Sequence, residues 1–428
     1  MNRPLYEVIK KKAHAKLKRF FMPSHAGENI SGLYESAKYD FTELDFSDNL
    51  LNPTGVIKEA EELLAKSYGA ADSLIFTCGA TSAIRVGLRT LREECESILV
   101  DGFSHKSVFE AVRNFSFKAD VLHREYDAEG FPLRLTADAV ERAFEKKRYD
   151  ALAVTVPDYF GNVLDLESIS EVCRKYGAKL FVDESQGAHF AFSSLLPKAA
   201  INFADMAVES LHKTMPVYGG GAVLNVKGDG KTARLYRAKF NTSSPSYIVM
   251  ASIDFARSFY DDFGEEKFKK LKLKVDGIKS VLKDKVKLSD DFSRLVVKAN
   301  APDLEKAGFY PEMTWGEYCV FILNFQNEKW LDKLTDRLSM QQTYGKPFDG
   351  KTLNELKGFD KVISASGKKE FVDLSRAVGK ICAIDIGCYP PGVPVIFEGE
   401  KITEEKIEFL KNKNVFNLVN NEICVIIS

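Results

Sequence analysis

Short apolar runs alternate with amphipathic stretches through the first half of the chain. The runs predict strands at Ser73–Thr77, Ser97–Val100, Asp150–Val156, Lys179–Val182, Ala204–Val208 and Ala222–Val226. Apolar residues spaced three or four apart predict helices at Val56–Tyr68, Ala83–Leu91, Lys106–Asn114 and Leu166–Tyr176. Nearly continuous apolar strands separated by helices are typical of a mostly parallel sheet buried on both faces. The pattern therefore predicts an α/β fold.

The two ends of the chain show other patterns. Residues 1–20 predict a helix, and Tyr247–Tyr260 and Glu265–Lys283 predict two long helices in sequence. Strands and helices then alternate at Arg294–Val297, Tyr318–Asn324, Lys329–Met340, Ile381–Ile386 and Glu404–Asn412. We therefore expect an N-terminal helical arm (1–44), a large domain (45–270) and a smaller α+β C-terminal domain (271–428).

Composition narrows the class of protein. The formal net charge of the 428 residues is −1, which gives no reason to expect nucleic acid or a membrane surface as a partner. No run of about 18 apolar residues predicts a membrane helix, and the lysine-rich start lacks the apolar core of a secretory signal. The seven cysteines are scattered without a C-x-x-C pair, which indicates reduced thiols and a cytoplasmic protein.

Polar clusters follow four of the predicted strands, at residues 78–82, 101–105, 183–189 and 210–214. Parallel α/β sheets bind ligands beyond the carboxyl ends of their strands. One site built from these four loops is the simplest explanation of the pattern.

Two of these clusters carry the residue types that bind pyridoxal phosphate (PLP). Lys213 follows one strand and can hold the cofactor as a Schiff base. Asp183 ends another strand and can keep the pyridine nitrogen protonated, so that the ring accepts electrons. A lone lysine after a strand is usually a surface lysine, so the prediction depends on the residues around it.

Several neighbours fit the same cofactor, although each also has a simpler interpretation. The turn Gly79–Ser82 precedes a helix and can bind phosphate, or it is an ordinary capped turn. His105 can stack on a flat ring, or it caps the next helix. Ser210 and His212 flank the lysine and can reach a phosphate, and Gly219–Gly221 lets the chain turn beneath the cofactor.

Two further motifs carry little weight. Asp183, Glu184 and His189 suggest a metal site, but no third ligand type stands at metal-site spacing, so we predict no metal. Gly345–Thr352 fits the nucleotide-binding pattern G-x-x-x-x-G-K-[ST]. The residues before it are too polar for a buried strand and Pro347 removes an N–H donor, so we interpret it as a chance match.

The ordered motifs resemble the Orn/Lys/Arg decarboxylase family, in its short bacterial form, over nearly the whole chain. The matching segments are Pro23-x-His25-x-Gly27, Asp48–Gly55, Tyr68–Ala70, Gly79–Ser82, His105–Ser107, Val182–Glu184, Gly187–His189, Ser210–Thr214, Thr242–Tyr247, Tyr310–Met313 and Tyr389–Pro394. The resemblance implies PLP as cofactor and the aspartate-aminotransferase fold (fold type I). That fold has a mostly parallel seven-stranded sheet in the large, PLP-binding domain and a smaller α+β C-terminal domain.

Roles transfer by position from the same resemblance. Lys213 would be the Schiff-base lysine, Asp183 the pyridinium partner and His105 the stacking ring. The phosphate would be held by Ala80, Thr81, Ser82, Ser210 and His212. Ser243 and Ser244 would reach the cofactor of a neighbouring subunit, which implies a homodimer with shared active sites. Glu312 would face the distal cation of the substrate.

The implied function is decarboxylation of a basic amino acid (arginine, lysine or ornithine) to an amine and carbon dioxide, as in polyamine metabolism. Lys213 or His212 would return a proton to the α-carbon. The chain departs from the family pattern at Ser24, Gln186 and Gly219–Gly221. Two alternatives therefore stay open: another PLP reaction, such as transamination or aldol cleavage, and a catalytically degenerate PLP-binding homologue.

Overall fold

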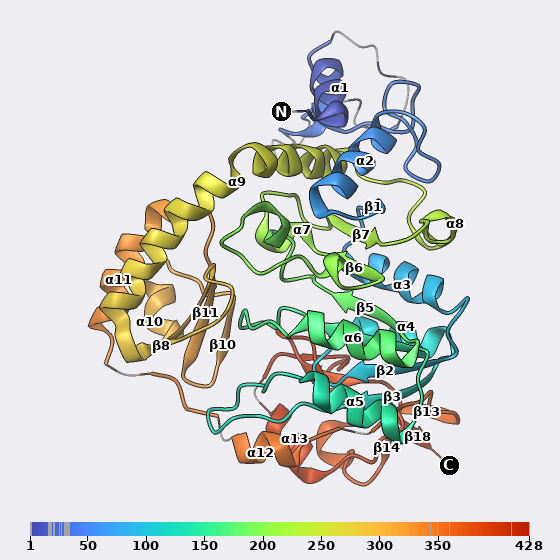
Figure 1. Cartoon of the computed structure of the whole chain (residues 1–428). Coiled ribbons are helices and arrows are strands. Elements are labelled where there is room, and N and C mark those ends of the chain that lie inside the picture. Colours follow the sequence, from blue (N-terminus) through green and yellow to red (C-terminus); the bar gives the residue numbers. More distant parts are fainter. Residues whose placement is uncertain are drawn as a thin grey trace.

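A computed structural model describes residues 2–15, 19, 22–24, 26, 28–29, 35–342, 344–348, 350–358, 360–411 and 413–427. Its centre is an eight-stranded sheet in the order β1-β7-β6-β5-β4-β2-β3-β12 (Figure 1). The strands are β1 Asp72–Phe76, β2 Ser97–Asp101, β3 Lys118–Leu122, β4 Ala151–Thr155, β5 Lys179–Asp183, β6 Met206–Glu209, β7 Ala222–Val226 and β12 Lys361–Val362.

The predicted mostly parallel sheet is confirmed. Strands β3, β2, β4, β5 and β6 pair in parallel, and β7 is antiparallel to both of its neighbours. The seven strands of the large domain are joined at one edge by β12, a two-residue strand from late in the chain that pairs antiparallel with β3. The parallel strands therefore end at one common edge of the sheet.

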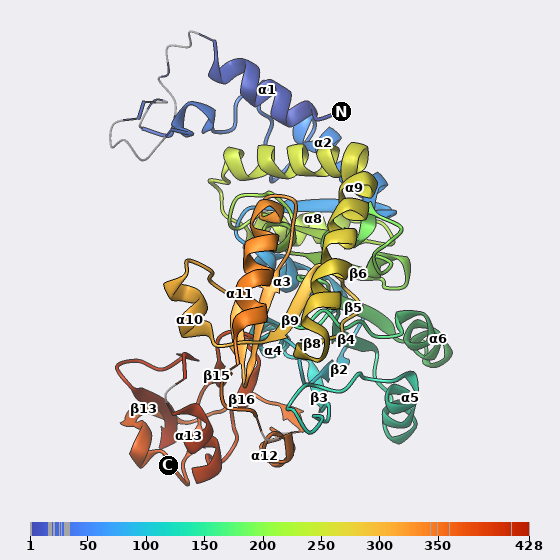
Figure 2. The ribbon, with the colours of Figure 1, turned by 90° about the vertical axis from the view of Figure 1, so that its left-hand side faces the viewer.

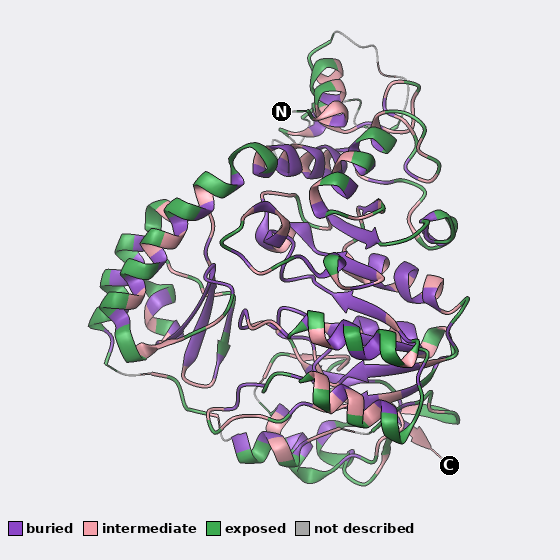
Figure 3. Cartoon of the chain, in the orientation of Figure 1, coloured by how far each residue is buried: buried purple, intermediate pink, exposed green. Residues whose placement is uncertain are grey.

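Both faces of the sheet are buried beneath helices (Figure 3). Alternate strand residues enter opposite cores because successive side chains of a strand point to opposite faces. Leu180 and Val182 join the core beneath α2, α5, α6 and α9, whereas Phe181 joins the core beneath α3, α4 and α8. These helices are α2 Val56–Tyr68, α3 Ala80–Leu91, α4 Lys106–Asn114, α5 Ala137–Lys146, α6 Leu166–Tyr176, α8 Lys231–Phe240 and α9 Tyr247–Leu282.

The pattern missed several elements of this layer (β3, α5, α8 and the edge strand β12), of which β3 and α5 show why. Strand β3 reads Lys-Ala-Asp-Val-Leu, and its charged residues interrupt the apolar run that marks a buried strand. Helix α5 buries only Val140 and Phe144, so its apolar stripe is narrow, and its start is marked chiefly by the cap in which Thr136 accepts from the Ala139 N–H. Both elements are stabilised by neighbours that the sequence pattern does not specify.

Helix α9 is one continuous helix of 36 residues, not two helices in sequence. Figures 1 and 2 show it running from the top of the large sheet to the outer lobe, where it packs along α11 (Leu331–Met340). Gly264, which lies between the two predicted ranges, packs against the backbone of Phe192 and leaves the helix intact. The predicted boundary after residue 270 therefore falls inside a helix, and the division into domains stays a prediction.

The chain after α9 forms three small antiparallel sheets (Figure 2). One orders β10-β11-β9-β8, from Met313–Trp315, Tyr318–Ile322, Arg294–Lys298 and Val286–Lys287, with α10 (Ala301–Lys306) alongside. The others order β13-β18-β14 and β16-β15-β17, from Lys368–Asp373, Glu422–Ile427, Ile381–Cys382, Pro394–Ile396, Ile386–Cys388 and Val415–Phe416. The predicted strand Ile381–Ile386 is wrong, because its two ends belong to different sheets.

The helices at the two ends are shorter than predicted. Helix α1 spans Pro4–Ala13, and residues 16–18 and 20 of the predicted helix lie outside the described residues. Helix α12 spans Gly350–Glu355 and α13 spans Glu404–Leu410. Among the described helices, none is both long and apolar enough to cross a membrane. All seven cysteines are described and none forms a disulfide; the cytoplasmic location stays a prediction.

Candidate active site

A cavity of about 180 Å³ opens at the carboxyl edge of the large sheet. All four polar clusters that follow predicted strands contribute to it, through Thr81, His105, Asp183 and Lys213 among others. A fifth wall comes from the far end of the chain, through Tyr389, Pro391 and Val393. The parallel sheet thus brings together side chains more than 100 residues apart, as the strand-end pattern predicts.

Lys213 lies on α7, a four-residue helix (Leu211–Thr214) directly after β6. Burial lowers the pKa of its ammonium group; Asp183 and Glu312 oppose the shift and Arg294 adds to it. Its Nζ lies 5.8 Å from the centre of the Tyr159 ring. A lysine with a lowered pKa keeps more of the neutral amine that attacks a carbonyl carbon.

Asp183 is the last residue of β5 and is almost completely buried. Burial raises the pKa of its carboxyl group, and the hydrogen bonds from Ser185 and the charge of Lys213 work against that rise. A buried carboxylate facing a cavity is stabilised by a cation that enters it. As an acceptor, the Asp183 carboxylate fits the protonated ring nitrogen of PLP, which donates a hydrogen bond.

The structure confirms that His105 caps a helix and places its ring in the cavity wall, and its stacking on a flat ring stays a prediction. Its Nδ1 accepts the Ser107 N–H at 3.2 Å and so caps α4, while the ring lines the cavity. Burial, with the charges of Lys213 and Lys106, lowers its pKa to about 3. The imidazole is therefore neutral near pH 7. Its other edge packs against Gly392, whose carbonyl accepts the Lys106 N–H at 2.8 Å.

Four of the five residues predicted to hold a phosphate line the cavity. Ala80 and Thr81 form the first turn of the 12-residue helix α3, where backbone N–H groups favour an anion. Ser210 and His212 line the same cavity, and His212 Nδ1 lies 3.2 Å from the Gly221 carbonyl oxygen. Ser82 does not line it; its hydroxyl donates to the Cys78 carbonyl at 3.4 Å.

The glycine run after the lysine supports this end of the site. Gly220 has a φ of +92°, and a Cβ there would stand 2.7 Å from the Thr77 carbonyl oxygen. Its own carbonyl accepts the Gly79 N–H at 2.7 Å. Only glycine fits this close approach without strain, so the run holds the loop before α3.

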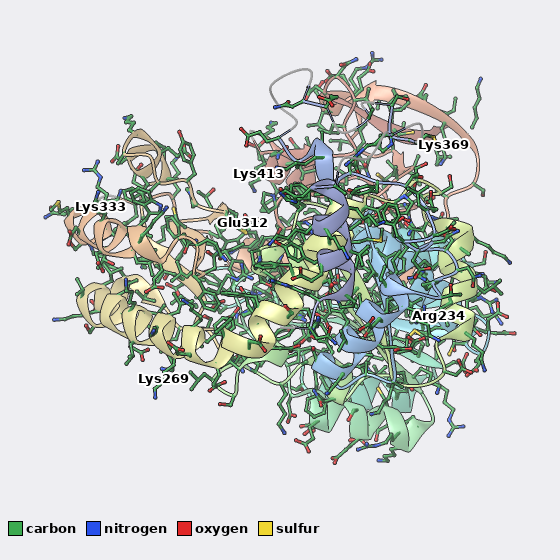
Figure 4. All side chains as sticks on the ribbon, turned by 90° about the horizontal axis from the view of Figure 1, so that it is seen from above. Arg234, Lys269, Glu312, Lys333, Lys369 and Lys413 are labelled. Carbon is green, nitrogen blue, oxygen red and sulfur yellow. The ribbon has the colours of Figure 1, made fainter. Side chains whose placement is uncertain are left out.

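Besides Ser82, three predicted site residues lie outside the cavity wall. Glu312 is exposed and borders a neighbouring groove, yet its charge acts on both Lys213 and Tyr159. Figure 4 labels it where the lobe of α9 and α11 meets the rest of the molecule. Ser243 and Ser244 are exposed and are not part of the cavity wall within one chain.

Tyr159, which was not among the predicted site residues, lines the cavity beside Lys213. It stands four residues after β4, so the strand-end rule applied to the predicted strand Asp150–Val156 identifies it. Tyr389 also lines the cavity, but it belongs to no strand end of the large sheet. Only its place in a segment that resembles the family marked it.

The weak motifs gain no support from their surroundings. His189 is buried against Asp291 and Ser293, away from the cavity. Within the described residues, no group of three His, Cys, Asp or Glu side chains is arranged to hold a metal ion. Helix α11 ends at Met340, and the described residues between it and Gly345 form no strand. Asp349 of that motif lies outside the described residues, as do His25 and Gly27.

Comparison with known proteins decides the family. The model of the Orn/Lys/Arg decarboxylase major domain matches residues 3–330, and that of the C-terminal domain matches residues 340–420. The chain belongs to the Orn/Lys/Arg decarboxylase family. The resemblance seen in the motifs is thereby confirmed, and with it PLP as the cofactor and amino-acid decarboxylation as the class of reaction.

Relatives match along almost the whole chain. An uncharacterized protein of Bacillus subtilis, YaaO, is 29% identical over 96% of this chain and 94% of its own length. An arginine decarboxylase of Bacillus subtilis is 27% identical over 95% of this chain and 92% of its own. At these identities the family is established, and the substrate is a separate question.

Solved structures share the fold. The lysine decarboxylase LdcF of Francisella novicida superposes with a TM-score of 0.77 at 16% identity, over 99% of this chain and 80% of that one. A serine palmitoyltransferase with PLP matches 69% of this chain and 80% of its own, with a TM-score of 0.53 at 16% identity. Both likenesses confirm fold type I.

Proposed function

We propose that this protein decarboxylates a basic amino acid, arginine, lysine or ornithine, to the corresponding amine and carbon dioxide. The observation that carries the proposal is that Lys213 and Asp183 line the same cavity. The negative charge of Glu312 also acts on Lys213, where it raises the pKa against the effect of burial. The arginine decarboxylases among the relatives support the same class of substrate.

The cofactor, when bound, supplies an electron sink for the pair of electrons that the departing carboxylate leaves behind. Asp183 would hold its ring nitrogen, and Ala80, Thr81, Ser210 and His212 would hold its phosphate. The flat, neutral ring of His105 would cover one face. Lys213, whose pKa burial lowers, is suited to carry a proton to the α-carbon near neutral pH.

Substrate choice depends on the far side of the site. A basic side chain carries a cation several bonds from the α-carbon, and burying that cation without a partner costs several kcal/mol. Glu312 is the acid that we assign to it, because its charge reaches Lys213 and Tyr159 although it stands on another lobe. A carboxylate accepts a guanidinium or an ammonium group, so Glu312 does not choose among the three amino acids.

The test is carbon dioxide release from arginine, lysine and ornithine, with glutamate as a negative substrate, by wild type and Glu312→Gln. Loss of a hydrogen bond to a charged group, about 1.5–3 kcal/mol, should lower kcat/KM roughly 10- to 100-fold. Glu305→Gln, an exposed neighbour on α10, should leave it unchanged. No release from any of the three substrates would refute the function, and an unchanged kcat/KM would remove Glu312 from the site.

We also propose a homodimer in which Ser243 and Ser244 of one subunit reach the cofactor site of the other. The exposure of both serines, and of Phe240 just before them, supports this assignment. Light scattering should show a dimer. Ser243→Ala with Ser244→Ala should weaken PLP binding without lowering the unfolding temperature of the apoprotein, and a fully active monomer would refute the shared site.

A further inference from the structure

Arg294 is a buried cation without full pairing, close to the cavity. It is the first residue of β9 and is 1% exposed. Its Nη2 donates to Gln186, to the side-chain Oε1 at 3.1 Å and to the backbone carbonyl at 3.3 Å. Its Nε and Nη1 have no hydrogen-bond partner among the described residues. A buried guanidinium left in this state is costly, and such groups gather at functional sites.

The contact with Arg294 sets the direction of the Gln186 side chain. A guanidinium can only donate hydrogen bonds, so the amide oxygen of Gln186 must face it. The amide N–H groups then point away from Arg294. Gln186 and Tyr159 both line the cavity, and hydrogen bonding from the Gln186 side chain lowers the pKa of the Tyr159 phenol. Gln186 therefore donates to the Tyr159 oxygen, and the hydroxyl keeps its own proton free to donate elsewhere.

Tyr159 is presented to the cavity by a rigid turn. Asp158 is buried and accepts the N–H groups of Phe160 and Asn162, both at 2.9 Å, and the Asn162 side-chain amide at 3.0 Å. The turn is joined to the segment that carries Arg294, because the Asp291 N–H donates to the Gly161 carbonyl at 2.9 Å. Tyr159, Gln186 and Arg294 thus belong to one connected structure.

Two opposite charges act on the Tyr159 hydroxyl. Burial raises the pKa of this phenol, the charge of Glu312 adds to the rise, and the charge of Arg294 opposes it. A basic amino acid carries both charges, a carboxylate at one end and a cation at the other. Placing the carboxylate toward Arg294 and the cation toward Glu312 pairs each with its opposite.

We propose that the Tyr159 hydroxyl donates a hydrogen bond to the α-carboxylate of the substrate, and that Gln186 and Arg294 are positioning residues that aim it. The orientation of the substrate along this axis rests on the proposed function. Gln186 is a departure from the family pattern, so the device is a property of this chain and not a transferred role.

The test compares two probes that differ only in the carboxylate: an amino acid and the amine formed by its decarboxylation. Binding is measured by absorbance titration of PLP-loaded protein, with the amino acid, basic or not, that shifts the wild-type spectrum most. Tyr159→Phe should raise the Kd of the amino acid about 10- to 100-fold and change that of the amine less than about twofold. Tyr176→Phe, at the end of α6, is the matched control and should change neither.

The positioning role has its own readout. In the Tyr159→Phe background, Gln186→Met should add no further loss of amino-acid binding, because its effect acts through the missing hydroxyl. Additive losses would overturn the positioning role, and equal losses for amino acid and amine would overturn the carboxylate contact. Arg294→Met should repeat the Gln186→Met result; if that buried variant fails to fold, the Gln186→Met cycle decides alone.

A failure of the proposed function gives a different result from a failure of the carboxylate contact. If the proposed function is wrong, wild-type protein releases no carbon dioxide from any basic amino acid, whatever the Kd values of Tyr159→Phe are. The ratio of the two Kd values tests the carboxylate contact independently of turnover.

Discussion

The two walls of the active-site cavity are built in opposite ways. One wall consists of strand ends of the large sheet and carries Asp183, His105 and Lys213, each within a few residues of a parallel strand. The other wall comes from loops after α9, including Tyr389 and Val393, with Glu312 beyond them. We propose that the first holds the residues for PLP chemistry and that the second, with Glu312, recognises the substrate. Chemistry and selectivity are therefore separable by mutation.

The largest effect should follow from removing the lysine of the first wall. Lys213→Ala loses the amine that binds PLP and the group that moves a proton, and the latter alone is worth roughly 10²- to 10⁴-fold in rate. Borohydride reduction and peptide mapping should find no cofactor attached at this position. Lys269→Ala, an exposed lysine of α9, serves as the control. A covalent, reducible chromophore in Lys213→Ala would show that another lysine is used.

A smaller loss should follow from Asp183→Asn. A carboxylate beside a cation shifts the pKa of its partner by about 1–3 units, so turnover should fall roughly 10- to 1000-fold once the charge is gone. PLP should still bind, because an amide keeps the shape of the carboxyl group. Turnover close to wild type would mean that Asp183 is not the partner of the ring nitrogen.

The junction of the two walls is tested at Gly392. Its φ is +81°, and a Cβ there would stand 2.6 Å from His105 Cδ2. Gly392→Ala therefore combines backbone strain of about 1–2 kcal/mol with overlap of about 1–3 kcal/mol. Gly379→Ala is the matched control, since its φ is +84° with nothing within 4 Å of the added Cβ.

Denaturation and PLP titration measure both glycine variants. Only Gly392→Ala should also weaken PLP binding, because it displaces His105. Equal effects of the two variants would mean that the walls do not depend on each other.

The smallest effect should appear beneath the first wall, where Glu209 and Glu184 are both buried. Burial raises the pKa of Glu209 from 4.5 to about 8, although hydrogen bonds from Glu184 and Asn225 lower it. The bound proton stabilises the fold fully below pH 4.5, and that stability is lost as the pH rises through 8. Glu209→Gln stays neutral, so it should unfold roughly 2–4 °C higher than wild type at pH 9 and equally at pH 5.

Glu59→Gln, on the exposed face of α2, controls for surface charge in the same melts. If the unfolding temperatures of Glu209→Gln and wild type differ by the same amount at pH 5 and pH 9, the difference does not come from the titration of Glu209. Such a result would assign the effect to packing.

The sequence predicted the first wall well because its signals are local. An apolar run followed by polar residues marks a strand end, and the parallel direction of the strands places such ends at one edge. Asp183, Lys213, His105 and Thr81 meet in the cavity for this reason. Ser82 follows Thr81 on the first turn of α3 but lies outside the cavity wall, because successive side chains of a helix are about 100° apart around its axis.

The second wall could be predicted only in part. The strand Ile381–Ile386 was wrong, since short strands in loops lack the periodicity that reveals register. The two predicted long helices form the single helix α9. Gly264, between the two predicted ranges, lies inside this helix, where the absence of a side chain lets it pack closely against the Phe192 backbone. Glu312 stands outside the cavity, and its proposed role rests on the effect of its charge on Lys213 and Tyr159.

The sequence alone determined the α/β class, the parallel sheet, the cofactor and the family, because hydrophobic periodicity and ordered motifs are properties of neighbouring residues. Only the tertiary structure decided that Arg294, Gln186 and Tyr159 form one connected group, since their three segments are far apart in the chain. Which group donates and which accepts in a buried hydrogen bond depends on the groups that surround it, and only folding brings those groups together.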